Sequence, residues 1–287
     1  MSKYTYKFFT PLVNFDSEER SFEIFDGVSI REINETELAV FQKAKEEWPN
    51  AQGGNYIIEC ILQKDAPESK PREFFPEVEH IFDQIITILR LFKPERVGYN
   101  LILQPYSSEP SAAYSGLHYK HQIMWMLSGS DYVNEKYEIS RADSLDLIQF
   151  AREIPFGSFS ELKLAIEYFN KSYIEPYTPR DAFIDIMITL ESLFLKGSRQ
   201  ELGYKLRMRM AFFMTDSPKK REKIFDKMRE AYKIRGAIVH GGSTDKLDLD
   251  FFLEMRKYAR ISLIEFLKKP NLRDELDTII LNSGNPT

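Results

Sequence analysis

The stretch AYKIRGAIVHGG, residues 231–242, marks the end of a long helix and carries two candidate groups for chemistry. Two glycines directly after His240 are typical of a helix terminus, because glycine readily adopts the left-handed conformation that ends a helix. Upstream, Pro218 suits a first helical turn. The pattern therefore predicts one helix over Pro218–Val239, with Arg235 and His240 close to its end.

The chain on both sides of this helix carries further helical patterns. The expected helices are Ser160–Lys171, Pro179–Leu195, Arg199–Met214 and Leu247–Lys268. In the second of them, one apolar stripe is formed by Phe183, Ile186, Met187, Leu190 and Phe194. Because such a stripe needs partner helices to cover it, the sequence predicts a compact helical bundle.

The amino-terminal part mixes strand and helix signals. Aromatic and β-branched residues predict strands in KYTYKFFT (3–10), SFEIF (21–25), VSIRE (28–32), NYIIECILQ (55–63) and VGYNLILQPY (97–106). Asn34 and Glu37 have the spacing of a capping box at the start of a helix that stops at Pro49, and residues 76–92 have helical periodicity. We therefore expect an α+β arrangement here, although its role is not legible from the sequence.

A stretch rich in Pro, Gly and Ser, IPFGSFS at residues 154–160, indicates a domain boundary. The expected fold class is α+β overall. It consists of a mixed α+β domain at 1–153, an all-α bundle at 154–270 and a short carboxy-terminal tail at 271–287. At 287 residues with 43% hydrophobic content, each domain has enough apolar surface for its own core.

Several function classes are disfavoured by composition. No apolar segment approaches the roughly 20 residues of a membrane-spanning helix, and the first residues lack a signal-peptide pattern. We therefore expect a cytoplasmic protein that does not bind membranes. Cys60 is the single cysteine, so no internal disulfide can form, and it reads as a buried core residue.

The net charge of −5 hides a basic segment. Residues 196–235 hold thirteen Lys or Arg against five acids, a net charge of +8. One interpretation is an ordinary solvated helix surface, and the other is a face that attracts phosphate. Under the second interpretation, the candidate RNA-binding residues are Lys205, Arg207, Arg209 and Lys233.

The remaining histidines offer little for a metal site. His118 and His121 have H-x-x-H spacing, but no Cys cluster or second histidine pair accompanies them, so we expect no metal and no cofactor. His80 reads as a surface or core histidine of its helix. His240 differs, because a helix end favours its charged form while Arg235 opposes it.

Arg235 and His240 lie five residues apart, which is roughly 140° around a regular helix. They converge only if the helix unwinds at the glycines or if a second subunit brings its own copy alongside. Metal-free RNA cleavage requires one group to remove the 2′-hydroxyl proton, another to protonate the leaving oxygen, and a cation. A two-fold dimer would supply two histidines and two arginines.

The RGAIVH motif, with Tyr232 before it and Gly241-Gly242 after it, resembles the R-x(4–6)-H signature of HEPN domains, especially the abortive-infection-like branch. The resemblance covers roughly residues 155–270 and includes ITLESLF (188–194) and LRMRMAFFM (206–214). It implies a dimeric, metal-independent endoribonuclease in defence, toxin or RNA-processing systems. It implies catalytic roles for Arg235 and His240, with Glu191 at an acidic helix position near them. The implied partners are a second copy, RNA or a nucleotide, and a regulatory protein.

A second function remains open within the same fold. Many HEPN domains are noncatalytic modules that dimerise or bind nucleotide, RNA or protein, and active members often place a polar residue where this chain has Gly236. A further alternative is that RGAIVH is a capped helix end with an incidental arginine. Glu191 has its own structural alternative, as the ion-pair partner of a bundle Arg or Lys.

Overall fold

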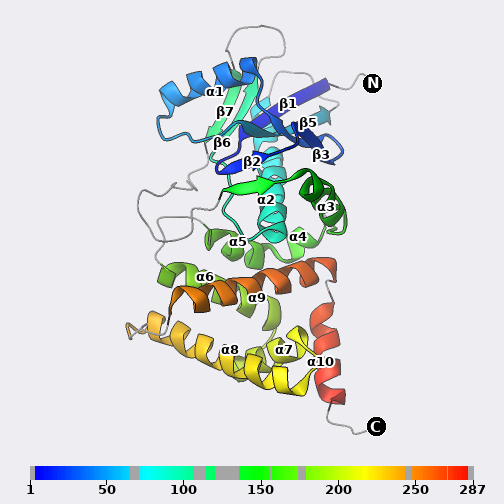
Figure 1. Cartoon of the computed structure of the whole chain (residues 1–287), viewed down its shortest axis with the longest axis vertical. Helices are drawn as coiled ribbons and strands as arrows, with labels where there is room; N and C mark the ends of the chain where they lie inside the picture. Colours follow the sequence, from blue (N-terminus) through cyan, green and yellow to red (C-terminus); the bar gives the residue numbers. More distant parts are fainter. Residues whose placement is uncertain are drawn as a thin grey trace. The chain divides into compact units, whose positions relative to one another are not determined.

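The computed structural model describes residues 4–64, 71–105, 114–119, 136–155, 157–173, 179–242, 247–269 and 271–283. The chain divides into two compact units, Met1–Glu153 and Ile154–Thr287. Over the described residues, the first unit holds a sheet with helices and the second is built from helices alone (Figure 1). The expected α+β fold class with an all-α carboxy-terminal part is confirmed.

The main sheet of the first unit has the strand order β3-β4-β5-β1-β6-β7 over the described residues, and its pairs are antiparallel. The strands are β1 Tyr4–Pro11, β3 Ser21–Phe25, β4 Val28–Glu32, β5 Tyr56–Lys64, β6 Leu101–Pro105 and β7 Tyr114–Tyr119. A separate parallel pair joins β2 (Phe15–Ser17) to β8 (Tyr137–Ile139). All five strands predicted from the sequence are present.

Helices cover both faces of this sheet. They are α1 Glu35–Glu47, the short 3₁₀ helix η1 Pro71–Phe74, α2 Phe75–Phe92 and α3 Arg141–Arg152. Phe8 and Phe9 are consecutive in β1 and point to opposite faces. Phe9 belongs to the core cluster that includes Val40 of α1, whereas the Phe8 ring lies 5.4 Å from the ring of Phe75 at the start of α2. The predicted capping box at Asn34 is formed.

The second unit contains helices in each segment where the sequence predicts one, but the expected helix Ser160–Lys171 is divided at Leu162 into two helices. The helices of this unit are α4 Ser158–Glu161, α5 Lys163–Lys171, α6 Pro179–Phe194, α7 Leu202–Met214, α8 Pro218–Val239, α9 Leu249–Lys268 and α10 Leu272–Asn282. Both ends of α8 fall where the sequence places them. Helix α6 contacts α5, α7, α8 and α9, and the residues of its apolar stripe are buried. At its end, the Phe194 ring lies 5.4 Å from Phe213 of α7 and 5.1 Å from Phe266 of α9.

The segment expected to be a short tail contains α10, which packs on α7. Arg209 of α7 donates two hydrogen bonds to the carboxylate of Asp277 in α10, at 2.8 and 2.7 Å, and a third to the carbonyl of Phe194. Arg273 of α10 donates from Nε to the carbonyl of Leu193 at 2.8 Å. Two guanidinium groups thus satisfy carbonyls at the end of α6 that have no partner within the helix. None of the described helices combines the length and the apolar character needed to cross a membrane.

Candidate functional site at the end of α8

The end of α8 is built by its two glycines. Gly241 adopts a positive φ of 73°, and its N–H donates to the carbonyl of Ile238 at 3.4 Å. The N–H of Gly242 donates to the carbonyl of Ala237 at 2.7 Å. These two bonds form a Schellman motif, which requires a residue that tolerates the left-handed conformation. The motif fixes His240 as the C-cap residue of α8, with its side chain exposed.

Arg235 faces Glu191 of α6. Its Nη2 donates a hydrogen bond to Oε2 of Glu191 at 3.3 Å, and its Nε lies 3.3 Å from Oε1 without hydrogen-bond geometry. The side chains are 31% and 21% exposed, respectively. Burial raises the pKa of the Glu191 carboxyl, and the charge of Arg235 opposes that rise. This hydrogen bond is long for an arginine–carboxylate pair, so Glu191 orients the guanidinium of Arg235 but binds it only weakly.

The structure brings two of the three expected catalytic residues together. The part of the chain that the structure describes contains no hydrogen bond or ion pair from the side chain of His240 to Arg235 or Glu191. Helix α8 stays regular through Val239, so it does not unwind to turn the imidazole back. Of the two routes to convergence, the one through local unwinding is therefore absent from this chain.

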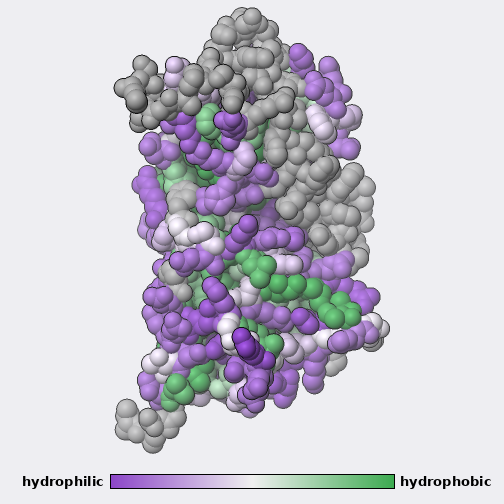
Figure 2. Space-filling view, turned by 180° about the vertical axis from the view of Figure 1, so that it is seen from behind, coloured by the Kyte–Doolittle hydropathy of each residue, from purple (hydrophilic) through white to green (hydrophobic). Residues whose placement is uncertain are grey.

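The last turn of α8 presents a half-exposed apolar surface. Val239 is 54% exposed, and Ala237 and Ile238 are partly exposed. Ile184 and Ile188 on the neighbouring helix α6 are partly exposed as well. Hydrophobic side chains also form a visible band across one face of the helical unit (Figure 2). A Cβ atom added to Gly236 would meet no atom of the described residues within 4 Å, so packing against them does not require a glycine there.

The four basic residues predicted to bind RNA have different surroundings. Lys233 is exposed and Lys205 is partly exposed, and neither pairs with a carboxylate among the described residues. Arg207 lies over the ring of Phe225 at 4.8 Å. Arg209 is instead held by Asp277 and the end of α6, with its side chain only 11% exposed. The structure thus gives Arg209 a role in anchoring α10, because its donors already have partners.

Sequence reasoning missed one unusual group, Asp185 of α6. It is 7% exposed, and its Oδ2 atom has no hydrogen-bond partner. Burial raises the pKa of this carboxyl to about 6, while the nearby Lys171 lowers it and Asp181 raises it further. Burial of a charged carboxylate oxygen without a hydrogen-bond partner is costly, so the folded protein favours the protonated form of Asp185. It lies six residues before Glu191, on a different side of α6.

The other histidines and the cysteine do not form a site. His118 lies in β7 with its side chain outside the described part, and His121 lies wholly outside the described residues. His80 contacts Gln84 on its own helix at 3.1 Å. Cys60 is buried, and burial raises its thiol pKa to about 12, which keeps it protonated and unreactive. The described residues include no group of three or more His, Cys, Asp or Glu that could hold a metal ion.

The first unit contains a cluster of four charged residues that is satisfied internally. Glu37 of α1 and Glu59 of β5 both pair with Arg31 and with Lys7. Burial alone would raise the pKa of the two carboxyls, but the cations lower it below the usual value. Each charge has a partner, so the cluster joins α1 to the sheet and offers no free group to a ligand.

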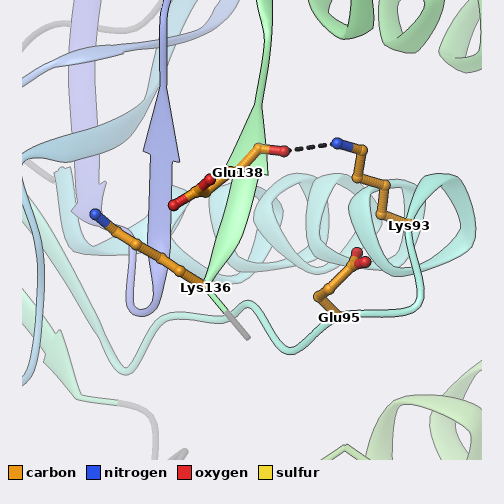
Figure 3. Close-up of a pocket in the computed structure, with 4 residues that line it drawn as sticks. All are labelled: Lys93, Glu95, Lys136 and Glu138. Carbon is orange, nitrogen blue, oxygen red and sulfur yellow. Dashed lines mark hydrogen bonds between the residues drawn. The ribbon is translucent and has the colours of Figure 1, made fainter. Parts of the chain in front are cut away.

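An open pocket of about 370 Å³ in the first unit is lined by Lys93, Glu95, Lys136 and Glu138 (Figure 3). Lys93 donates to the main-chain carbonyl of Glu138 at 2.7 Å and pairs with Asp143 at 2.9 Å. The side chain of Glu138 turns away from Lys93 and toward Lys136 (Figure 3). The ammonium group of Lys136 pairs with Asp16. Both ammonium groups thus have carboxylate partners, so the pocket does not present free cations to a phosphate.

Comparison of the sequence with protein-family models, with curated proteins and with solved structures found no match. Inference about function therefore depends on the residues at the end of α8 and on their surroundings.

Proposed function

We propose that this protein is a metal-independent endoribonuclease of the HEPN type, which cleaves RNA by attack of the ribose 2′-hydroxyl. The observation that supports this most directly is the placement of Arg235. Its guanidinium is oriented by Glu191 on α6, and it lies five residues before an exposed imidazole that a Schellman motif fixes at the end of α8. A positioned cation and an accessible histidine are the two group types that this reaction needs.

The active form in this proposal is a two-fold dimer. One chain supplies a single suitable histidine, whereas acid and base catalysis of this reaction uses two. The apolar last turn of α8 and the partly exposed isoleucines of α6 offer a surface for a second copy. A two-fold axis beside Arg235 would place both copies of the motif in one cleft, since an isologous interface uses the same patch on each subunit.

Each residue has a defined task in the reaction. His240 of one subunit removes the proton from the 2′-hydroxyl, whose oxygen attacks phosphorus. His240 of the second copy protonates the leaving 5′-oxygen, and Arg235 stabilises the negative charge that develops on the phosphoryl oxygens. Glu191 positions Arg235. The products are a 2′,3′-cyclic phosphate and a free 5′-hydroxyl.

The basic segment supports RNA as the substrate class. Lys205 and Lys233 project without carboxylate partners among the described residues, and Arg207 has none either. Their charge would raise the local concentration of a polyanion near the end of α8. We place this activity in the cytoplasm, in defence, toxin or RNA-processing systems, with a regulatory protein as a further partner of the amino-terminal unit.

A noncatalytic HEPN module is the second candidate, and Gly236 is the observation that favours it. The position directly after Arg235 provides no polar side chain to the site. In that case the same dimer would bind a nucleotide, RNA or protein without cutting it.

The deciding experiment is RNA cleavage by the purified full-length chain in EDTA. Wild type should cleave and leave 2′,3′-cyclic phosphate ends, and a 2′-deoxy substitution at the cut should block cleavage. His240→Ala should lower the rate by about 10²- to 10⁴-fold, the usual contribution of a general acid or base. His80→Ala, a histidine change in the other unit, should match wild type. Undiminished cleavage in both His240→Ala and Arg235→Ala would show that the constellation is structural.

A further inference from the structure

Helices α7 and α8 carry a cluster of rings and one guanidinium that the reaction does not use. The cluster consists of Tyr204, Arg207 and Phe225, and we refer to it as the stacking cluster. The Arg207 guanidinium lies 4.8 Å from the Phe225 ring centroid and 5.8 Å from that of Tyr204. The two rings are 6.0 Å apart in an edge-to-face arrangement. Tyr204 is 49% exposed, which is unusual for a ring that could have packed inward.

The guanidinium of Arg207 is held in place yet remains available. Its Nε donates to the carbonyl of Gly203, one turn earlier in α7, at 2.8 Å. The described residues provide no carboxylate partner for it, so its terminal nitrogens are open to a phosphate or a base. A guanidinium that is stacked on an aromatic ring presents a flat face on which a nucleobase can stack.

The stacking cluster lies on the same face of α8 as His240. Phe225, Arg229, Lys233 and His240 follow one another at spacings of four, four and seven residues, which keeps them within about 80° around the helix axis. Along the axis, Phe225 and His240 are roughly 22 Å apart. The cations between them are exposed, and the pairing of Arg229 with Asp226 at 2.9 Å is an exposed contact of little strength.

We propose that the stacking cluster binds an unpaired base of single-stranded RNA, and that the RNA backbone then runs along α8, past Arg229 and Lys233, toward His240. This inference depends on the proposed function only for naming RNA as the ligand. Stacking on exposed rings combined with a row of cations is how proteins hold single strands without reading their sequence. Duplex RNA would bind more weakly, because its bases are paired and stacked on each other.

Tests of the stacking cluster use the full chain carrying His240→Ala, so that bound RNA is not cut. Fluorescence anisotropy with a 12-nucleotide oligo(A) measures binding. Tyr204→Ala should weaken binding by about 5- to 100-fold, which corresponds to the loss of one base–aromatic stack. Tyr204→Phe keeps the ring and should bind like the parent. Lys196→Ala, which removes an exposed charge of the basic segment, should have a smaller effect than Tyr204→Ala.

A substitution of Arg207 distinguishes the contribution of stacking to RNA binding from that of charge. Arg207→Lys keeps the positive charge but loses the flat face, so oligo(A) binding should fall while the slope of affinity against salt stays the same. An abasic 12-nucleotide strand provides the backbone charge without bases and should bind equally to the parent and to Tyr204→Ala.

Three results would overturn the proposal. The first is parental affinity for oligo(A) in both Tyr204→Ala and Arg207→Lys. The second is an equal affinity of the parent for the oligo(A) and abasic strands. The third is competition by polyglutamate as strong as by RNA, which would point to an acidic protein partner. None of these outcomes depends on whether the protein cleaves RNA, since binding is measured without catalysis.

Discussion

Glu191 on α6 and Arg235 on α8 hold each other by one hydrogen bond of 3.3 Å, with a second pair of atoms at the same distance outside hydrogen-bond geometry. This loose pairing distinguishes Arg235 from Arg209, whose guanidinium is fully engaged by Asp277 and a helix carbonyl. An arginine that is oriented but not locked can exchange its carboxylate for a phosphate with little loss of contact.

The first prediction concerns Glu191 as a positioning residue. Glu191→Gln should keep the fold but lower the maximal rate of RNA cleavage by about 10-fold or more, because a misplaced cation stabilises the transition state less well. Single-turnover rates at saturating RNA would measure the loss. Glu254→Gln serves as the matched control, since Glu254 pairs with Lys227 at 2.6 Å, away from the motif. Equal rates in wild type and Glu191→Gln would restrict Glu191 to a structural role.

The second prediction concerns the buried carboxyl of Asp185, whose folded pKa is raised to about 6. The native state then binds a proton more tightly than the unfolded state, so stability declines as pH rises from about 4 to about 6. Asp185→Asn cannot ionise and should be more stable than wild type by about 1 to 3 kcal/mol above pH 6, with no gain near pH 4.

Urea unfolding at a series of pH values would measure this difference. Asp181→Asn removes a charge that raises the Asp185 pKa, so it should narrow the pH range of this dependence without abolishing it. A constant difference between Asp185→Asn and wild type across this pH range would contradict the assignment of the titration to Asp185.

A pair of glycine substitutions forms the third prediction. Gly236→Ala should stabilise the isolated chain by up to about 1 kcal/mol, because alanine favours a helix and a Cβ there meets no described atom within 4 Å. Gly203→Ala should instead destabilise it by about 1 to 3 kcal/mol, since the added Cβ would lie 2.9 Å from the ring of Tyr232. Thermal unfolding would measure the stability of the two variants. A loss of stability in Gly236→Ala would mean that another part of the protein or a second copy packs against α8 at Gly236.

The proposed dimer provides the fourth prediction. Light scattering should find two copies per particle at micromolar concentration. Val239→Glu places a charge on the apolar end of α8 and should yield monomers. Leu281→Glu, at a more exposed position on α10, should remain dimeric. A wild-type monomer, or a dimer that persists in Val239→Glu, would contradict a dimer interface at the end of α8.

The sequence predicted α8 to the residue because both of its ends carry local signals, a proline at the start and two glycines after the end. It missed α10, although Leu272, Leu276 and Ile279 have helical spacing in that segment. The ion pair of Asp277 with Arg209, which holds this helix, is a tertiary contact that no local pattern records.

The candidate site was predictable only in part. RGAIVH drew attention to Arg235 and His240, and the resemblance placed Glu191 near them, but the geometry of the Glu191–Arg235 contact depends on how α6 crosses α8. Asp185 gave no signal, because its burial comes from helices that are distant in sequence. Arg207 was selected for its charge, whereas its position over Phe225 depends on the packing of α7 against α8.

The last helix, α10, stabilises the end of α6 next to the candidate site through two arginines that bind carbonyls there. Arg273 reaches the carbonyl of Leu193, and Arg209, braced by α10, reaches that of Phe194, both within the turn that follows Glu191. A protease that cut the chain before Leu272 would remove Arg273 and the brace of Arg209 together. Fraying of α6 would then begin beside Glu191, so removal of a segment remote from RGAIVH in the sequence should weaken the contact between Glu191 and Arg235.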